Sequence, residues 1–328
     1  MRIGVHLRHW DGSPHDVAGL AELAEDAGLE SVWVSETWGS DATVLAAWIA
    51  AHTSRIAIGT GVLQMPARTP AAAAMAALTL DHLSGGRLRL GLGVSGPQVV
   101  EGWHGVPFGS PLARTREYVT LVRAVLARRE PLTLDGEVYQ LPVPGGGGRS
   151  LKTNVIPLRA DVPIYLAAMG PRNVALAAEI ADGWLPLLFS PEHVDVFELP
   201  ALRDGFDVAP MVLAAITDDL PAARDEVRQQ IALYVGAFGS KTKNFYADMV
   251  RRYGFESDVD RIQHAALDRR MADATAAVSD ELVDALTLVG PVARVRERLQ
   301  AYAEAGATSV LAMTKDPATI RGMSEAAS

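Results

Sequence analysis

The chain has 328 residues, of which 49 % are hydrophobic and 21 % are charged, a composition typical of a folded enzyme rather than of a disordered chain. It contains no cysteine, which excludes disulfides, thiolate metal sites and a cysteine nucleophile. A net charge of −9 without any Lys/Arg-rich run argues against a nucleic-acid partner. No apolar stretch reaches the roughly 18 residues of a membrane span, and the N-terminus reads as a strand rather than a signal peptide. We therefore expect a cytoplasmic protein that does not enter a membrane.

A helix followed by Ala-Gly and an apolar strand occurs near both ends of the chain. Residues 20–35 and 299–314 share this pattern, and a shorter copy surrounds Gly183. Gly28, Gly306 and Gly183 are each expected to end a helix in the left-handed conformation. The repeat favours a wound α/β architecture.

Eight segments read as strands, most of them continuous apolar runs of the kind found in a parallel sheet that is buried on both faces. These are residues 3–7, 31–35, 56–60, 88–93, 163–168, 184–188, 211–216 and 309–313. Helices are expected between most of them, at residues 16–27, 43–52, 70–83, 113–129, 171–180, 222–234 and 291–305. This alternation predicts an α/β protein with a (β/α)8 TIM barrel rather than an open doubly wound sheet.

Two insertions interrupt the alternation, near residues 131–160 and 236–286. The first contains an Asp135-Gly136 hairpin turn and a run of four glycines, and the second is mostly helical and charged. Neither reads as a separate domain, so we expect a single domain over residues 1–328. Insertions of this kind usually form lids or interface elements around a barrel mouth.

The segment from Gly91 to Gly96 (GLGVSG) matches the G-x-G-x-x-G dinucleotide fingerprint. A true fingerprint opens a helix in the first βα unit, whereas Pro97 follows here and the strand is the fourth of the chain. We interpret Gly91, Gly93 and Gly96 instead as a strand end where the backbone approaches a flat ligand. The histidines show no spacing typical of metal ligands, so no metal site is expected.

Two side chains at strand ends are candidates for catalysis. His6 ends the first strand on the side where barrel active sites lie, although a buried core histidine is an equal alternative. Glu36 directly follows the second strand, where it can transfer a proton or bond a ring nitrogen. Its alternative role, stabilising a helix N-terminus, suits Asp41 better. Trp10, Trp38 and Trp103 are candidate walls for a flat substrate.

Residues 169–172 (Met-Gly-Pro-Arg) follow the fifth strand and open a helix. Glycine before a helix and proline at its first position are ordinary entry residues. The free N–H groups of such a terminus can also hold a phosphate.

Several segments together resemble the luciferase-like monooxygenase superfamily, and within it the F420-dependent branch that includes the methylenetetrahydromethanopterin reductases. They are residues 35–41 (SETWGSD), 58–62 (IGTGV), 77–86 (ALTLDHLSGG), 91–96, 114–118 (RTREY), 167–172 (AAMGPR), 181–184 (ADGW) and 289–290. The resemblance spans nearly the whole chain in consistent order.

The resemblance implies a barrel, usually dimeric, with a flavin or deazaflavin across its mouth. It also implies a non-prolyl cis peptide at Gly61–Val62 behind the central ring. The cofactor-binding residues that follow are Glu36, Thr60, Gly61, Val62, Gly93, Val94, Ser95, Gly96, Ala168, Met169, Gly170, Pro171 and Arg172. Glu36 and His6 remain the catalytic candidates.

One departure from the family bears on the substrate. Sugar-phosphate dehydrogenases of this family carry an Asp-His pair after strand two and an acid after strand four, whereas this chain has Glu36-Thr37 and Gly96-Pro97 there. We therefore expect an F420-dependent oxidoreductase that moves a hydride to or from a C=C, C=N or alcohol/carbonyl carbon of another small molecule. The alternatives are an FMN-dependent monooxygenase and a cofactor-binding protein without turnover. The expected partners are this substrate and a second copy of the chain.

Overall fold

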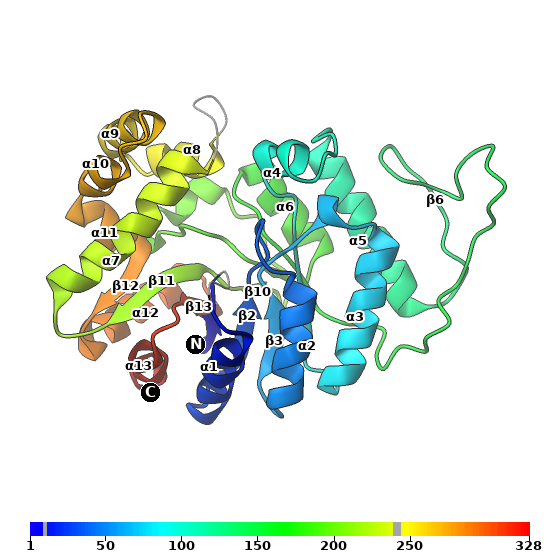
Figure 1. Ribbon diagram of the computed structural model, residues 1–328, viewed down its shortest axis with the longest axis horizontal. Helices are drawn as coiled ribbons and strands as arrows, with labels where there is room; N and C mark the ends of the chain where they lie inside the picture. Colours follow the sequence, from blue (N-terminus) through cyan, green and yellow to red (C-terminus); the bar gives the residue numbers. More distant parts are fainter. Residues whose placement is uncertain (9–11, 239–243) are drawn as a thin grey trace.

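The computed structural model describes residues 1–8, 12–238 and 244–328, with parallel strands at the centre and helices outside (Figure 1). The strands of the central sheet are β1 (Arg2–His6), β2 (Ser31–Val34), β3 (Ala57–Thr60), β4 (Leu63–Gln64), β5 (Leu88–Gly93), β8 (Ile164–Leu166), β9 (Gly183–Trp184), β10 (Asp207–Val208), β11 (Met211–Ile216), β12 (Thr287–Gly290) and β13 (Ser309–Met313). The helices are α1 (Pro14–Asp26), α2 (Ala42–His52), α3 (Pro70–Ser84), α4 (Pro97–Gly102), α5 (Pro111–Ala127), α6 (Pro171–Ile180), α7 (Leu220–Ala232), α8 (Phe245–Arg252), α9 (Glu256–Leu267), α10 (Met271–Ala276), α11 (Asp280–Leu286), α12 (Val292–Glu304) and α13 (Pro317–Ala327).

The sheet curls round and closes through the segment that holds β10 and β11. The parallel order runs β10-β9-β8-β5-β3-β2-β1-β13-β11-β12. Leaving aside β12, which pairs only with β11, the series begins at β10 and finishes at β11. Only Ala209 and Pro210 separate them along the chain. The Ala209 N–H donates to the Trp184 carbonyl at 2.9 Å, and the Leu311 N–H donates to the Pro210 carbonyl at 2.9 Å. Counted as one strand, β10–β11 completes a barrel of eight within the described residues, which confirms the predicted fold class.

The main differences from the predicted elements lie in short segments. β12 (Thr-Leu-Val-Gly) was not predicted, because a segment of four residues directly after a helix shows no strand period. It pairs with β11, with Thr287 opposite Leu213. The strand expected at 184–188 is reduced to β9 and one isolated bridge, since Leu188 turns to a left-handed φ of 54°. α13 was also missed, although Asp316 caps it and Pro317 opens it.

Two of the three predicted helix-ending glycines have the expected conformation. Gly28 has φ of 78° and Gly306 has φ of 91°. The prediction for Gly183 is wrong, because Ala181 caps the end of α6 and Gly183 lies inside β9. A Cβ on Gly183 would lie 2.3 Å from Cε1 of Tyr165, so glycine is needed there for close packing rather than for a turn.

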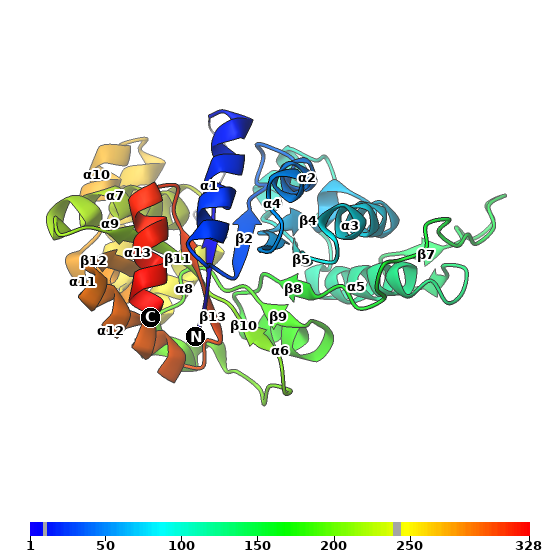
Figure 2. The same cartoon turned by 90° about the horizontal axis from the view of Figure 1, so that it is seen from below.

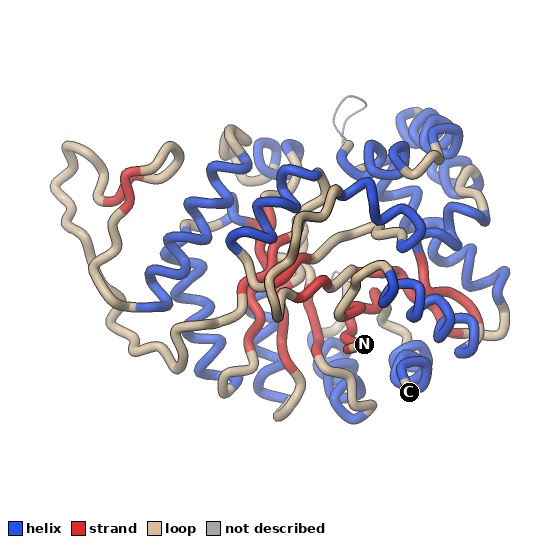
Figure 3. Tube along the Cα trace, turned by 180° about the vertical axis from the view of Figure 1, so that it is seen from behind, coloured by secondary structure: helices blue, strands red, loops and turns tan. Residues whose placement is uncertain are grey.

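The hydrophobic core is one cluster of buried side chains that runs from Ile3 to Ala326. Its largest members include Trp33 and Trp184, both almost fully buried. Seen from behind in Figure 3, helices surround the strands on the outside of the barrel. No helix among the described residues is long and apolar enough to cross a membrane.

The first insertion forms an arm that extends away from the barrel (Figures 1 and 2). Its antiparallel strands β6 (Leu134–Asp135) and β7 (Gln140–Leu141) form the predicted hairpin, and the Gly136 N–H donates to the Tyr139 carbonyl at 3.0 Å. The second insertion contributes α8 to α11, as its helical composition predicted. α8 and α4 both lie on the upper side of the barrel in Figure 1, the side reached by the chain after β5.

Candidate active site

Four strands are followed by a non-glycine residue with a left-handed backbone. Arg8 (φ 51°) follows β1, Thr37 (φ 49°) follows β2, Ser95 (φ 60°) follows β5 and Leu188 (φ 54°) follows β9. Such conformations cost on the order of 1 kcal/mol each or more and concentrate at functional sites. All four lie at the C-terminal ends of strands, where TIM barrels carry their active sites.

The residues after β3 form a flat shelf at this mouth. The Gly61–Val62 peptide is cis, as the family resemblance implied. A Cβ on Gly61 would lie 2.6 Å from Nε2 of His6, and a Cβ on Gly93 would lie 2.7 Å from Cγ2 of Val62. Both glycines are therefore required by close approach, and the structure brings these four predicted residues together. The shelf suits a planar ring that lies across the mouth.

His6 supports the shelf from behind. The backbone N–H of Arg8 donates to Nδ1 of His6 at 3.2 Å, so the proton of the neutral ring is assigned to Nε2, which donates to the Gly61 carbonyl at 2.9 Å. The side chain is buried, and this burial lowers the pKa of His6 to about 4. The imidazole is therefore neutral near pH 7, with both ring nitrogens engaged.

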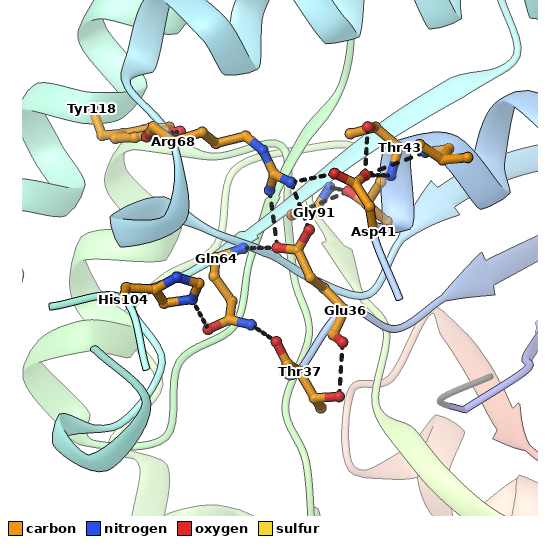
Figure 4. Close-up of polar contacts among 11 residues, drawn as sticks. Glu36, Thr37, Asp41, Thr43, Gln64, Arg68, Gly91, His104 and Tyr118 are labelled. Atoms are coloured by element: carbon orange, nitrogen blue, oxygen red, sulfur yellow. Dashed lines mark hydrogen bonds and ion pairs between the residues drawn. The ribbon is translucent and has the colours of Figure 1, made fainter. Parts of the chain in front are cut away.

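Glu36 is held in a buried ion pair by a residue that sequence reasoning missed. Nη2 of Arg68 donates to Oε1 at 2.7 Å and Nη1 donates to Oε2 at 2.9 Å (Figure 4). The backbone N–H of Gln64 donates to Oε2 at 2.8 Å. Burial alone would lower the pKa of Arg68, but the bonds and charge of Glu36 outweigh it and raise that pKa. The two side chains thus form a bidentate ion pair.

Arg68 also connects the surrounding elements. Its Nη2 lies 3.0 Å from Oδ2 of Asp41, the residue that caps α2 through the Thr43 N–H. The Tyr118 hydroxyl of α5 donates to the Arg68 carbonyl at 3.1 Å. The guanidinium of Arg68 thus contacts both Glu36 after β2 and Asp41 at the start of α2. The backbone of Arg68 is held by the hydrogen bond from Tyr118 of α5.

A second polar pair, also missed, lies next to the shelf. The side-chain amide N–H of Gln64 donates to the Thr37 carbonyl, and its Oε1 lies 3.3 Å from Nε2 of His104. Figure 4 shows this chain of contacts running from His104 through Gln64 to Thr37, beside the Glu36–Arg68 pair. A long-range contact of this kind has no sequence period, so only the structure reveals it.

The loop after β8 leads into α6 as predicted. Gly170 precedes the helix, Pro171 opens it and Arg172 is exposed. A Cβ on Gly170 would meet no atom within 4 Å, so the helix start is open. Arg252 of α8 donates to the carbonyl of Met169 at 3.4 Å, which brings the second insertion against this loop. Ala168, by contrast, is buried, and its carbonyl accepts from Nε1 of Trp184 at 2.8 Å.

The remaining predicted residues fall into different settings. Thr60 is fully buried and its hydroxyl exchanges bonds with Gly91 at 2.8 and 2.9 Å, so it fastens β3 to β5. Val94 and Ser95 are half-buried after β5, and Gly96 caps α4.

The glycine motif is explained mainly by strand packing. A Cβ on Gly91 would lie 1.9 Å from the Thr60 carbonyl oxygen, so this glycine approaches a neighbouring strand rather than a ligand. The interpretation of Gly91 as a ligand contact is therefore wrong. Gly93 packs on Val62 of the shelf in the same way.

The aromatic residues proposed as substrate walls are only partly described. Trp38 is 48 % exposed and meets Phe238 edge to face, with ring centroids 5.2 Å apart. Trp103 ends α4 and is 65 % exposed. Trp10 lies outside the described residues.

Comparison with known proteins gives one family. Residues 1–309 match the family model for luciferase-like monooxygenases. A putative coenzyme F420-dependent oxidoreductase of Mycobacterium tuberculosis is 44 % identical, over 98 % of this chain and 98 % of that protein. A 5,10-methylenetetrahydromethanopterin reductase of Methanolobus tindarius is 29 % identical, over 90 % of this chain and 89 % of that protein.

Solved structures show the same fold. The coenzyme F420-dependent tetrahydromethanopterin reductase of Methanopyrus kandleri superposes with a TM-score of 0.83 at 23 % identity, over 99 % of this chain and 97 % of that one. An F420-dependent secondary alcohol dehydrogenase, solved with an F420-acetone adduct, superposes with a TM-score of 0.78 at 17 % identity, over 99 % and 97 %. The resemblance predicted from the sequence is confirmed.

Proposed function

The chain belongs to the luciferase-like monooxygenase family, and we propose that within it the protein is a coenzyme F420-dependent oxidoreductase acting on a small organic substrate. The observation that carries the proposal is the shelf at Gly61–Val62, backed by His6, in a chain that matches an F420-dependent oxidoreductase over 98 % of its length. The named relatives favour F420 over the FMN alternative. Titration of the purified protein with each cofactor, followed by a substrate screen with the one that binds, tests it.

The residues at the mouth fit the parts of this cofactor. F420 supplies a ring carbon that carries the hydride. The shelf supports the ring, and Val94, Ser95 and Gly96 border it from the end of β5. The open start of α6 offers main-chain N–H groups to the phosphate, with Arg172 beside them.

Cations near the start of α6 favour F420 over FMN. FMN ends at its phosphate, whereas F420 continues into an acidic lactyl-glutamate tail. Arg172 is exposed at the helix start, and Arg252 reaches the Met169 carbonyl next to it from α8. These two side chains would hold the carboxylates of a tail that passes between α6 and the second insertion.

The bonds of Glu36 favour orientation over proton transfer. Both carboxylate oxygens accept bonds from Arg68, and one also accepts from the Gln64 backbone. Glu36 therefore fixes Gln64 and the shelf, and through them the ring.

We further propose that the protein forms a homodimer through α2, α3 and the arm. The exposed face of α3 carries Ala72, Met75, Thr79, His82 and Leu83, with no acidic residue, Lys or Arg. Met75 is 61 % exposed, and Ile156 of the arm is 72 % exposed. Nε2 of His82 lies 2.9 Å from the carbonyl oxygen of Ile156, which brings the arm next to α3. An apolar surface of this kind is typical of an interface.

A Met75→Glu variant tests the dimer. Light scattering should show a dimer for the unmodified chain and a monomer for the variant, because a buried unpaired carboxylate opposes association. A dimer in both would contradict this surface. That the protein is a single domain working in the cytoplasm stays a prediction from the sequence.

A further inference from the structure

His104 lies on the loop that follows α4, close to the shelf. Its backbone N–H donates to the Val99 carbonyl at 3.0 Å, and the Val106 N–H donates to the Val100 carbonyl at 3.0 Å. The loop is thus anchored on α4 at both sides of the histidine. The side chain is half-buried and points to Gln64, which stands two residues after the shelf (Figure 4).

The orientation of Gln64 fixes the tautomer of His104. The Thr37 carbonyl only accepts hydrogen bonds, so the Gln64 atom that meets it is the amide nitrogen. The Gln64 oxygen then faces Nε2 of His104 at 3.3 Å and accepts a hydrogen bond from its N–H. Nδ1 of His104 is left as a lone-pair acceptor, and the described part of the chain places no bonding partner on it.

Within the described residues, the two catalytic candidates Glu36 and His6 have no such free position. Glu36 is bonded through both oxygens, and His6 is bonded through both ring nitrogens. His104 combines a partly exposed imidazole with a fixed neutral tautomer. Imidazole is also the side chain best suited to exchange protons near neutral pH.

We propose that His104 is the catalytic residue that exchanges a proton with the substrate oxygen, that Gln64 is its positioning residue, and that the substrate is an alcohol or its carbonyl counterpart. This inference rests on the proposed function. In the oxidation direction the hydroxyl proton would pass to Nδ1 of His104 and the C=O bond would form, while bound oxidised F420 would supply the acceptor for the hydride that leaves the C–H carbon. In the reduction direction the imidazolium would return the proton to the carbonyl oxygen, and bound reduced F420 would supply the hydride for the carbonyl carbon.

Gln64 assists because its side-chain oxygen accepts the hydrogen bond of the His104 Nε2–H group. That bond strengthens when the ring becomes positive, since charge-assisted hydrogen bonds are stronger than neutral ones. The backbone of Gln64 is held by Glu36 and its amide nitrogen by Thr37. The ion pair with Arg68 therefore acts on His104 through Gln64 rather than on the substrate.

The geometry is tested first without any turnover. Long-range proton–nitrogen NMR spectra of the 15N-labelled protein, assigned with a His104→Gln variant, should show His104 as the Nε2–H tautomer at pH 8. Gln64→Leu should remove this preference and give a tautomer mixture. A wild-type spectrum with the proton on Nδ1, or no change in Gln64→Leu, would overturn the positioning role.

The chemistry is tested with alcohols and oxidised F420, and with the matching carbonyl compounds and reduced F420. His104→Gln should lower kcat by roughly 10²–10⁴-fold and abolish the acidic limb of its pH profile for alcohol oxidation, while F420 affinity changes less than about threefold. Gln64→Leu should lower kcat less and displace that limb. His264→Gln, on the exposed face of α9, is the matched control and should behave as wild type.

These experiments distinguish a failure of F420 binding from a failure of the assignment of His104. If wild-type protein does not bind F420, the proposed function fails and the proton role falls with it. If wild type binds F420 and oxidises alcohols but His104→Gln keeps its kcat and pH profile, only the assignment of His104 is overturned. Turnover restricted to C=C or C=N substrates would overturn the alcohol/carbonyl assignment alone.

Discussion

Arg68 donates two hydrogen bonds, of 2.7 and 2.9 Å, to the carboxylate of Glu36. Glu36 is only 6 % exposed. The pair joins the residue after β2 to the entry of α3, 32 positions later in the chain. Because Glu36 also accepts the Gln64 N–H, the pair sets the position of the shelf segment. The ion pair therefore links the end of β2, the shelf segment and the start of α3.

Replacing Arg68 with an uncharged residue should destabilise the folded protein. Arg68→Met leaves the buried Glu36 carboxylate without its partner, which should lower the free energy of unfolding by about 3–5 kcal/mol in urea titrations. The double variant Arg68→Met/Glu36→Gln should recover much of this loss. Arg116→Met breaks the exposed pair with Glu179 and should cost far less, because water screens both charges. Equal losses for the two arginines would contradict the role of the buried pair.

Gly61→Ala should damage the shelf. The new Cβ would lie 2.6 Å from Nε2 of His6, so the imidazole or the shelf must shift. We expect F420 affinity, measured by fluorescence, to fall at least tenfold. Gly19→Ala in α1 meets no atom within 4 Å and is the control. A Gly61→Ala variant that binds F420 like wild type would remove the shelf from the cofactor site.

His6 should make stability depend on pH. Its pKa is about 4 in the folded protein, against about 6.5 unfolded, so between these values the unfolded chain binds a proton that the folded one does not. Stability contributed by neutral His6 is complete above about pH 6.5 and falls as the pH drops towards 4, by roughly 3 kcal/mol. The loss of stability between about pH 6.5 and pH 4 should be smaller by that amount in His6→Gln than in wild type. In His264→Gln it should equal the wild-type loss. Parallel pH curves for His6→Gln and wild type would refute the buried neutral histidine.

Gly170→Ala tests main-chain binding of the phosphate. The added methyl meets no protein atom within 4 Å, so the fold should be unaffected while the ligand is obstructed. We expect a larger loss of F420 affinity than for Arg172→Ala, which should weaken binding only modestly. Gly148→Ala, also in open space, is the control. The reverse order of losses would assign the phosphate to the arginine side chain.

The barrel was predictable because its signals are local. Apolar strands, capped helices and helix-ending glycines such as Gly28 each leave a mark within a few residues of sequence. The shelf at Gly61–Val62 came from the family resemblance, since periodicity says nothing about a cis bond.

The contacts within the site were not predictable in the same way. Arg68 meets Glu36 across 32 positions and His104 meets Gln64 across 40, and no propensity or spacing rule links residues so far apart. Arg68 is the side chain that meets Glu36, while Trp38, expected as a wall for the substrate, packs on Phe238. A buried carboxylate requires a partner, but the sequence alone does not name it.

The identity of the cofactor is tested most directly by titrating the protein with F420 and with FMN. F420 should bind the purified protein saturably, with one site per chain, and FMN should bind at least tenfold more weakly because it lacks the tail that Arg172 and Arg252 are proposed to hold. Fluorescence titration of each cofactor, with an Arg252→Ala variant in parallel, measures both affinities. Arg252→Ala should weaken F420 binding and leave FMN binding unchanged. Tighter binding of FMN than of F420 by the wild-type protein would contradict the account.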